Sequence, residues 1–257
     1  MTDLASLAAR IIDGSIEVID LTSPLHAQTP ILRLPPEWGQ TQTFQLEEIS
    51  RYDDRGPAWY WNNFRTGEHT GTHFDAPKHW ITGQDGEDVA SAPPRRLVGP
   101  AVVLDFSEQA AENPDFLLEV DDIRAWEGEH GALPARGWLL YRTGWDARSA
   151  SQEAFLNADE DGPHTPGMSV ECAHWLAEQS PVVGLGVETV GTDAGAAAGF
   201  DPMFPCHTLM HGAGKYGLTQ LQNLAELPAT GAILVVSPLK IVGGSGSPAR
   251  VLALVEH

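Results

Sequence analysis

The chain has 257 residues, of which 42% are hydrophobic and 19% charged, a balance that suits a globular protein with a substantial core. Its formal net charge is −20, because 35 acidic residues outnumber 15 basic ones. This excess of negative charge disfavours binding to nucleic acid or to an anionic membrane surface. No apolar run approaches the roughly 18 residues that cross a bilayer, and no basic segment followed by an apolar stretch marks a secretory signal. We therefore expect a cytoplasmic protein without a nucleic-acid or membrane partner.

In chain order, the sequence predicts a mixture of helices and strands. A short amphipathic helix comes first and ends near Gly14, since apolar residues mark one helical face: Leu4, Leu7, Ala8, Ile11 and Ile12. Strand-like runs follow at Ile16–Leu21, Ala101–Phe106, Trp138–Arg142, Val182–Glu188, Ile233–Val236 and Val251–Val255. Helices are expected after Asp121, after Ser169 as N-cap, and over about residues 219–227. Pro and Gly are not pooled in one linker, so we predict a single α/β domain over residues 1–257.

The richest segment for chemistry is the run from residue 69 to residue 79. It holds four side chains that can bind a metal ion or move a proton: His69, His73, Asp75 and His79. Side chains alternate faces in an extended chain, so the first three can project from one side of a strand. Pro77 cannot donate to a sheet and is expected to end that strand, which leaves His79 on the following turn. Two imidazoles and a carboxylate suit a divalent ion such as zinc or manganese, although a hydrogen-bonded cluster without metal remains the alternative.

Aromatic residues gather just before this run. Trp59 and Trp61 share the parity of His69, so one continuous strand would place all three on the same face. Such side chains can form a flat apolar wall for a planar substrate. The alternative is that they pack in the core. Elsewhere, Cys172 and Cys206 are too few for a disulfide framework and are expected to be buried free thiols.

The residues from His69 to His79 resemble the H-x-G-T-H-x-D-x-P-x-H signature of the cyclase superfamily of metal hydrolases. This superfamily includes bacterial kynurenine formamidases, isatin hydrolases and some lactone hydrolases. Three further segments resemble the same family and extend the likeness along most of the chain: Leu97–Asp105, Val183–Glu188 with Thr192-Asp193, and the glycine-rich Gly243–Arg250.

The resemblance implies a swivelling β/β/α-type fold and a homodimer or higher homo-oligomer. It implies that His69, His73 and Asp75 are metal ligands and that His79 is the general acid/base. It further implies that His207 contacts the metal or the substrate. In this interpretation Trp59 packs against the substrate ring.

One departure from the family pattern points to a particular substrate. Kynurenine formamidases with two zinc ions have a glutamate ligand twelve residues after the later histidine, where this chain has Thr219. Losing that carboxylate favours a single divalent ion, manganese rather than zinc, as in isatin hydrolases. The aromatic stretch Trp59–Trp61 also resembles isatin hydrolases more than formamidases. The expected substrate is a small aromatic cyclic amide, isatin, which hydrolysis opens to isatinate.

Three other functions remain open from the sequence. The first is arylformamidase action on N-formylkynurenine, and the second is lactone hydrolysis. The third is a metal-stabilised binding protein without catalysis, against which the intact His79 argues. Among the other histidines, His211 lies four residues after His207 and could share its helical face, which makes it a weak candidate for a supporting role.

Overall fold

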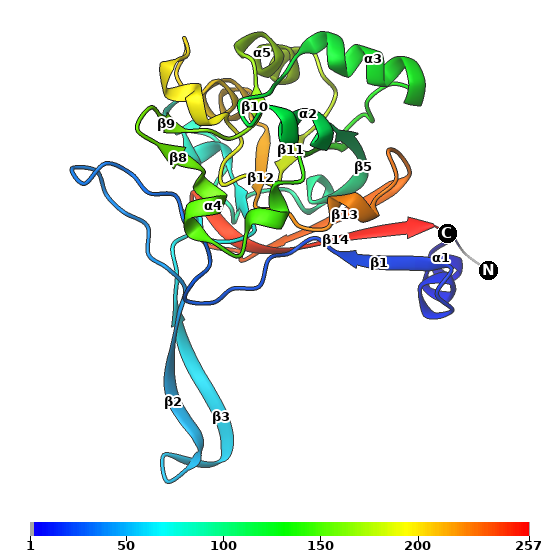
Figure 1. Cartoon of the computed structure of the whole chain (residues 1–257). Coiled ribbons are helices and arrows are strands. Elements are labelled where there is room, and N and C mark those ends of the chain that lie inside the picture. Colours follow the sequence, from blue (N-terminus) through cyan, green and yellow to red (C-terminus); the bar gives the residue numbers. More distant parts are fainter. Residues whose placement is uncertain (1–2, 257) are drawn as a thin grey trace.

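The computed structural model describes residues 3–256 and is built around one large mixed sheet (Figure 1). The strand order is β1-β14-β13-β5-β7-β11-β12-β4, and β14 also pairs with β4. The strands from β14 to β4 therefore close into a barrel, and β1 lies outside the closure. The strands of this sheet are β1 (Ile16–Asp20), β4 (His73–Asp75), β5 (Val98–Asp105), β7 (Trp138–Arg142), β11 (Gly184–Val187), β12 (Tyr216–Thr219), β13 (Ala232–Pro238) and β14 (Gly246–Glu256).

Alternation along the strands produces two separate cores. On β7, Leu140 packs in an inner cluster with Phe74 and Leu218, whereas its neighbour Leu139 packs in an outer cluster with Leu176. The outer cluster lies under helices that gather over the upper part of the molecule in Figure 1. These helices include α2 (Ser107–Glu112), α3 (Val120–His130) and α5 (Val170–Glu178). Both faces of the central strands are thus buried, which explains their nearly continuous apolar sequences.

Most of the predicted elements are confirmed. Each of the six strand-like runs overlaps a strand of the sheet, and α1 covers Asp3–Ile12. The hydroxyl of Ser169 accepts a hydrogen bond from the Cys172 amide and caps α5 as expected. Both cysteines are buried free thiols. The expected mixed α/β class is also confirmed.

The helix predicted over residues 219–227 is wrong. Thr219 ends β12, where it pairs with His73, and only Leu224–Glu226 form a single 3-10 turn. Gln220 and Asn223 have φ angles of 54° and 59°. Two left-handed residues so close together prevent a continuous right-handed helix.

A long β-hairpin projects from the body of the protein (Figure 1). Its strands are β2 (Gln45–Asp53) and β3 (Gly56–Arg65), and they pair only with each other. The remaining short elements are β6 (Leu117–Leu118), α4 (Gln152–Leu156), β8 (Ala158–Asp159), β9 (Gly162–Pro163) and β10 (Gly167–Met168). Within residues 3–256, no helix is both long enough and apolar enough to span a membrane.

A buried carboxylate, that of Glu188, follows the end of β11. Its Oε2 accepts hydrogen bonds from the amides of Thr143 and Trp145, while its Oε1 has no partner among the residues that the structure describes. Burial, together with the nearby Asp146, outweighs the hydrogen bonds from the two amides and raises the pKa of Glu188 to about 7. The folded protein therefore binds a proton here that the unfolded chain releases at a lower pH.

We predict that this group makes stability fall as pH rises. The pKa of Glu188 is raised on folding, so its contribution to the free energy of unfolding is complete below about pH 4.5 and is lost as pH rises through about 7. Glu188→Gln, which keeps an oxygen acceptor, should reduce the loss of stability between pH 5 and pH 8 by about 2–3 kcal/mol. Urea unfolding at both pH values measures this, with the exposed Glu112→Gln on α2 as control. An unchanged pH dependence in Glu188→Gln would contradict the prediction.

Candidate metal centre and active site

Strand β4 carries two of the predicted site residues on one face. Phe74 points into the inner core, where its ring lies 4.8 Å from that of Tyr216. Alternation therefore places His73 and Asp75 on the opposite face, and both are almost fully buried. Burial opposes the ionisation of Asp75, but His73 and His69 outweigh it and hold the pKa of this carboxyl well below its usual value. The sequence thus predicted the shared face of His73 and Asp75.

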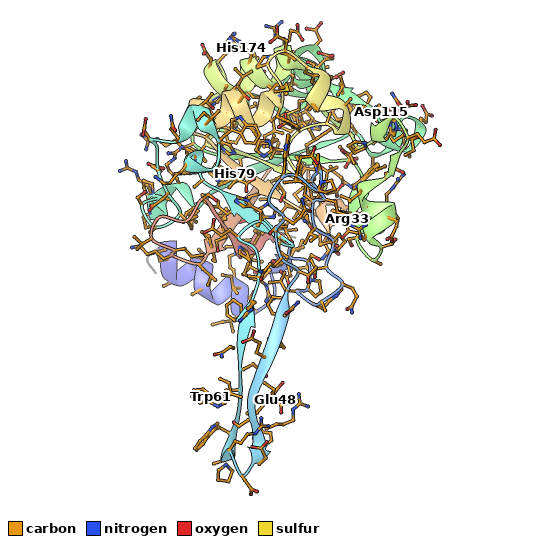
Figure 2. All side chains as sticks on the ribbon, turned by 90° about the vertical axis from the view of Figure 1, so that its left-hand side faces the viewer. Arg33, Glu48, Trp61, His79, Asp115 and His174 are labelled. Atoms are coloured by element: carbon orange, nitrogen blue, oxygen red, sulfur yellow. The ribbon has the colours of Figure 1, made fainter. Side chains whose placement is uncertain are left out.

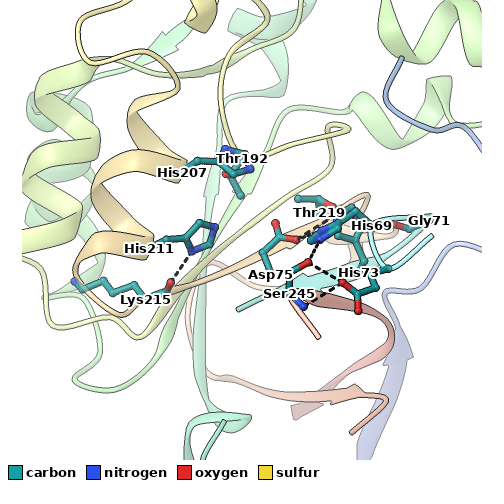
Figure 3. A network of polar contacts seen from close by, with 11 residues as sticks. His69, Gly71, His73, Asp75, Thr192, His207, His211, Lys215, Thr219 and Ser245 are labelled. Atoms are coloured by element: carbon teal, nitrogen blue, oxygen red, sulfur yellow. Dashed lines mark hydrogen bonds and ion pairs between the residues drawn. The ribbon is translucent and has the colours of Figure 1, made fainter. Parts of the chain in front are cut away.

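His69 reaches the same place by a different route from the one expected. The strand begins only at His73, and His69 lies in a preceding turn in which Gly71 has a φ angle of +65°. The Nδ1 of His69 lies 2.7 Å from Oδ1 of Asp75, and its Nε2 lies 2.9 Å from the Ser245 hydroxyl (Figure 3). The prediction that His69 sits on the strand is wrong, since a left-handed glycine interrupts the extended chain.

His79 lies on the turn after the strand, as predicted. It ends the 3-10 helix Pro77–His79, and its ring stacks on that of His69 with centroids 3.9 Å apart. Burial, together with the imidazoles of His69 and His207, outweighs the charge of Asp75 and lowers the pKa of His79 to about 2. His79 is therefore neutral and has a lone pair that can accept a proton.

His207 comes from a separate element, the π-helical segment Cys206–His211. Asp193 accepts hydrogen bonds from the amides of Cys206 and His207 and also pairs with Nδ1 of His207. Burial alone would lower the pKa of His207, but the hydrogen bond and charge of Asp193 outweigh it and raise that pKa. Its ring centroid lies 5.4 Å from that of His79, so two imidazoles whose pKa values are shifted in opposite directions face each other.

Two further residues, Asp193 and Trp80, border this site. Asp193 lies in a segment that resembles the family, but no spacing rule connects it to His207. Trp80 follows His79 directly, and its ring centroid lies 4.8 Å from that of His207. Its indole N–H donates to the hydroxyl of Thr208 at 3.0 Å. Trp80 is thus an aromatic side chain of this chain that borders the site.

Trp59 does not border the site of its own chain. Strand β3 ends at Arg65, before His69, so the continuous strand that would align the two residues does not exist. Figure 2 shows Trp61 far along the projecting hairpin, well away from His79 in the body. Trp59 lies on the same strand and crowds Gly56 beside the hairpin turn, and 47% of its surface is exposed. The expectation that its parity brings it beside His69 is wrong.

The clustered side chains can hold a divalent ion. Within the described residues, two groups of three have candidate ligand atoms within 4.8 Å of one another: His69, Asp75 and His79, and Asp75, His207 and His211. Asp75 belongs to both groups. His73 belongs to neither, but its Nε2 lies 3.4 Å from Oδ1 of Asp75. Imidazoles and a buried anionic carboxylate are ligands that zinc and manganese accept, so the donor set fits the ion that the motif implies.

Thr219 occupies the position that the sequence compared with a glutamate ligand. It is fully buried on β12, opposite His73 in the sheet. Its hydroxyl oxygen lies 2.9 Å from Nδ1 and 3.0 Å from Nε2 of that histidine (Figure 3). Thr219 therefore contacts a predicted ligand without adding a negative charge.

Taken together, the site gathers imidazoles and a buried carboxylate, side chains that can bind a divalent ion and transfer a proton. Comparisons with known proteins agree. Residues 19–194 match the family model "Putative cyclase". The chain is 48% identical to an isatin hydrolase of Roseibium aggregatum, over 98% of this chain and 97% of that protein. It is 28% identical to a kynurenine formamidase of Salinibacter ruber, over 91% and 95% of the respective chains.

A solved structure gives the same result. Isatin hydrolase A from Ralstonia solanacearum superimposes with a TM-score of 0.97 at 55% identity, covering 100% of this chain and 98% of that one. The chain therefore belongs to the cyclase family of metal-dependent hydrolases. It is much more similar to the isatin hydrolases than to the formamidase, and the fold implied by the sequence motif is confirmed.

We predict that Gly246→Ala weakens metal binding. A Cβ at this position of β14 would lie 2.4–2.9 Å from three atoms of the His69 ring, so that ring would have to move. A displaced ligand or its support typically costs about 10- to 100-fold in metal affinity. Chelator competition measures the metal dissociation constant. Gly128→Ala on α3, where an added Cβ meets no atom within 4 Å, is the control and should bind metal normally.

Proposed function

We propose that this protein hydrolyses the cyclic amide isatin to isatinate in a metal-dependent reaction. The observation that carries the chemistry is the pair of imidazoles of His79 and His207, which face each other with centroids 5.4 Å apart and both lie close to the carboxylate of Asp75. The similarity to isatin hydrolases along the whole chain supports the choice of substrate. Trp80 also supports a planar substrate, because its aromatic surface beside His207 can pack against a substrate ring.

His69, His73 and Asp75 would hold the ion. His79 and His207 both lie close to Asp75. When bound, such an ion polarises a carbonyl and lowers the pKa of water towards about 7. The ligand set stays a prediction. Its main support is the shared face of His73 and Asp75 and the contact between His69 and Asp75.

The protein's own residues would move the protons. Water adds to the lactam carbonyl carbon, and the lone pair of His79 accepts the proton that the water loses. The carbon–nitrogen bond then breaks, and His79 returns that proton to the leaving nitrogen. The acid formed ionises to the carboxylate, so one proton leaves the site for each turnover.

His207 would stabilise negative charge on the substrate oxygen. Asp193 engages Nδ1, which leaves Nε2 as the donor toward the site. Asp193 raises the pKa of His207, which favours a positively charged donor when the carbonyl oxygen becomes anionic. The same contact can hold the product carboxylate. Asp193 acts through His207 and is a positioning residue.

We further propose a single ion, manganese in preference to zinc. The support is Thr219, whose hydroxyl contacts His73. Formamidases with two zinc ions carry a glutamate at the position that corresponds to Thr219. Without that carboxylate, a second divalent ion would lack an anionic ligand of its own.

The projecting hairpin supports a homo-oligomer. An isolated two-stranded hairpin is marginally stable in water, yet this one exposes large apolar side chains: Leu46, Tyr52, Trp59, Tyr60, Trp61 and Phe64. The apolar residues Leu4 and Ile12 of α1 are exposed as well. Surfaces of this kind mark protein–protein contacts. We propose that the hairpin packs on a second copy of the chain and brings Trp59 to that copy's substrate site.

The first prediction of this proposal is metal-dependent loss of isatin. Chelator-stripped protein should be inactive, and manganese should restore more activity than zinc. Absorbance of isatin gives the rate.

His79→Gln should lower kcat by about 10²- to 10⁴-fold while still binding metal, since general acid–base catalysis contributes about that much. The exposed His174→Gln is the matched control and should keep full activity.

Other outcomes separate the alternatives. Metal-dependent activity on N-formylkynurenine alone would replace the proposal by arylformamidase action. Selective cleavage of esters would indicate a lactone hydrolase. Metal binding without turnover of any of these substrates would favour a non-catalytic binding protein. Wild-type turnover by metal-loaded His79→Gln would show that the acid/base assignment is wrong.

Mixed oligomers test the position of Trp59. Trp59→Ala should raise the KM for isatin about tenfold or more and leave the metal content unchanged, because a large contact with the ring is lost. In oligomers mixed from Trp59→Ala and His79→Gln subunits, a Trp59 from one subunit can serve the intact His79 of the other. Activity at low isatin should therefore exceed that of either variant alone. If it stays at the sum of the two variants, Trp59 does not act across subunits.

A further inference from the structure

His211 is a buried polar side chain that the proposed mechanism does not use. It ends the π-helical segment Cys206–His211, and only 2% of its surface is exposed. Its Nδ1 lies 3.0 Å from the carbonyl oxygen of Lys215, whereas its Nε2 has no hydrogen-bond partner within residues 3–256. A buried nitrogen without a partner costs free energy, and such atoms are uncommon in folded proteins. This cost is relieved if a ligand occupies the position that Nε2 faces.

The contact with Lys215 determines which kind of ligand atom fits. A carbonyl oxygen can only accept, so Nδ1 of His211 must be the donor and carries the ring proton. Nε2 of the neutral ring is then an acceptor. The partner that is missing must therefore be an N–H or O–H group, or a cation.

The ring of His211 faces the reaction centre. A ring nitrogen of His211 lies within 4.8 Å of candidate ligand atoms of Asp75 and His207. The ring centroid is 5.9 Å from that of His79 and 5.5 Å from that of His207. Figure 3 shows the ring extending from its helix toward Asp75, while the Lys215 carbonyl lies on its other side. The unpaired acceptor thus adjoins the space in which a substrate carbonyl must meet His79.

We propose that Nε2 of His211 accepts a hydrogen bond from the lactam N–H of the substrate and so selects cyclic amides with an unsubstituted nitrogen. This inference rests on the proposed function and assigns the residue that recognises the nitrogen. In a lactam, the nitrogen is bonded to the carbonyl carbon that water attacks. An acceptor beside His79 and His207 is therefore in the right region to meet that N–H.

The contact also orients the leaving group. When the carbon–nitrogen bond breaks, the nitrogen retains its hydrogen, takes the bond's electron pair and gains one proton from His79. A nitrogen whose N–H points to His211 presents that new lone pair in another direction, where His79 can reach it. His211 itself neither gains nor loses a proton in this sequence. A lactone has an oxygen in place of the N–H and would leave Nε2 unpaired.

Binding of two ligands of the same shape tests the inference. Oxindole carries a lactam N–H, whereas 2-indanone has a CH₂ group in its place, and neither has the reactive second carbonyl of isatin. Titration calorimetry on the manganese-loaded protein gives both dissociation constants. We expect the wild type to bind oxindole about 10- to 100-fold more tightly, as one buried hydrogen bond allows. Equal binding, or binding of neither ligand, would overturn the proposal.

Two substitutions identify His211 as the origin of this preference. His211→Leu removes the acceptor at similar size and should reduce the preference for oxindole to less than about threefold, mainly by weakening oxindole. His211→Gln retains an oxygen acceptor and should keep much of the preference. The metal content and thermal unfolding of each variant are measured alongside. A His211→Leu protein that keeps the wild-type preference would contradict the inference.

Metal content and turnover of isatin separate a role in ligand recognition from a role in metal binding. If His211→Leu loses one equivalent of metal, His211 binds a cation together with Asp75 and His207, and the proposal falls. If oxindole is preferred through His211 but isatin is not hydrolysed, the substrate is a different cyclic amide, and only the choice of isatin fails. If isatin is hydrolysed and His211 has no influence on the preference, the function stands and this inference alone is wrong.

Discussion

The candidate site depends on the pairing of β4 on both of its edges. This three-residue strand is bonded to β12 on one side and to β14 on the other, which closes the barrel. Phe74 is held in the inner core, so its neighbours His73 and Asp75 must face outward together. A shift in register by one residue would place both polar groups in an apolar core and expose Phe74. The geometry of the site is therefore maintained by the packing of one phenylalanine and the hydrogen bonds of two neighbouring strands.

Two carboxylates divide the histidines into different electrostatic environments. Asp75 is shared by the imidazoles that would bind the ion, whereas Asp193 is paired with His207 alone. As a result the pKa of His207 is raised, while burial among other imidazoles lowers that of His79. Similar side chains only a few ångströms apart thus acquire opposite tendencies, one to hold a proton and one to remain unprotonated. The difference between the pKa values of these histidines therefore depends on the positions of the two carboxylates.

The parts of the site that were predicted from the sequence are those controlled by local geometry. Alternation gave the common face of His73 and Asp75, and Pro77 gave the turn that carries His79. The failures arise where the chain leaves regular structure. Gly71 takes His69 off the strand, Gln220 stops an expected helix, and Trp59 lies on a strand of the hairpin that ends before His69. The pairing of Asp193 with His207 depends on tertiary contacts, for which no local pattern exists. The family motif identified the residues, and the fold was required to show how they meet.

The contact between β14 and the motif also affects when the site can form. Gly246 lies against the His69 ring, and Ser245, just before this strand, contacts Nε2 of that histidine. Both belong to a segment that is synthesised long after the motif itself. A growing chain on the ribosome therefore carries its metal-binding residues well before it possesses the surface that shapes them. Contacts between such distant segments form late in folding. The predicted metal-binding geometry around His69 is accordingly complete only after β14 has been synthesised and paired.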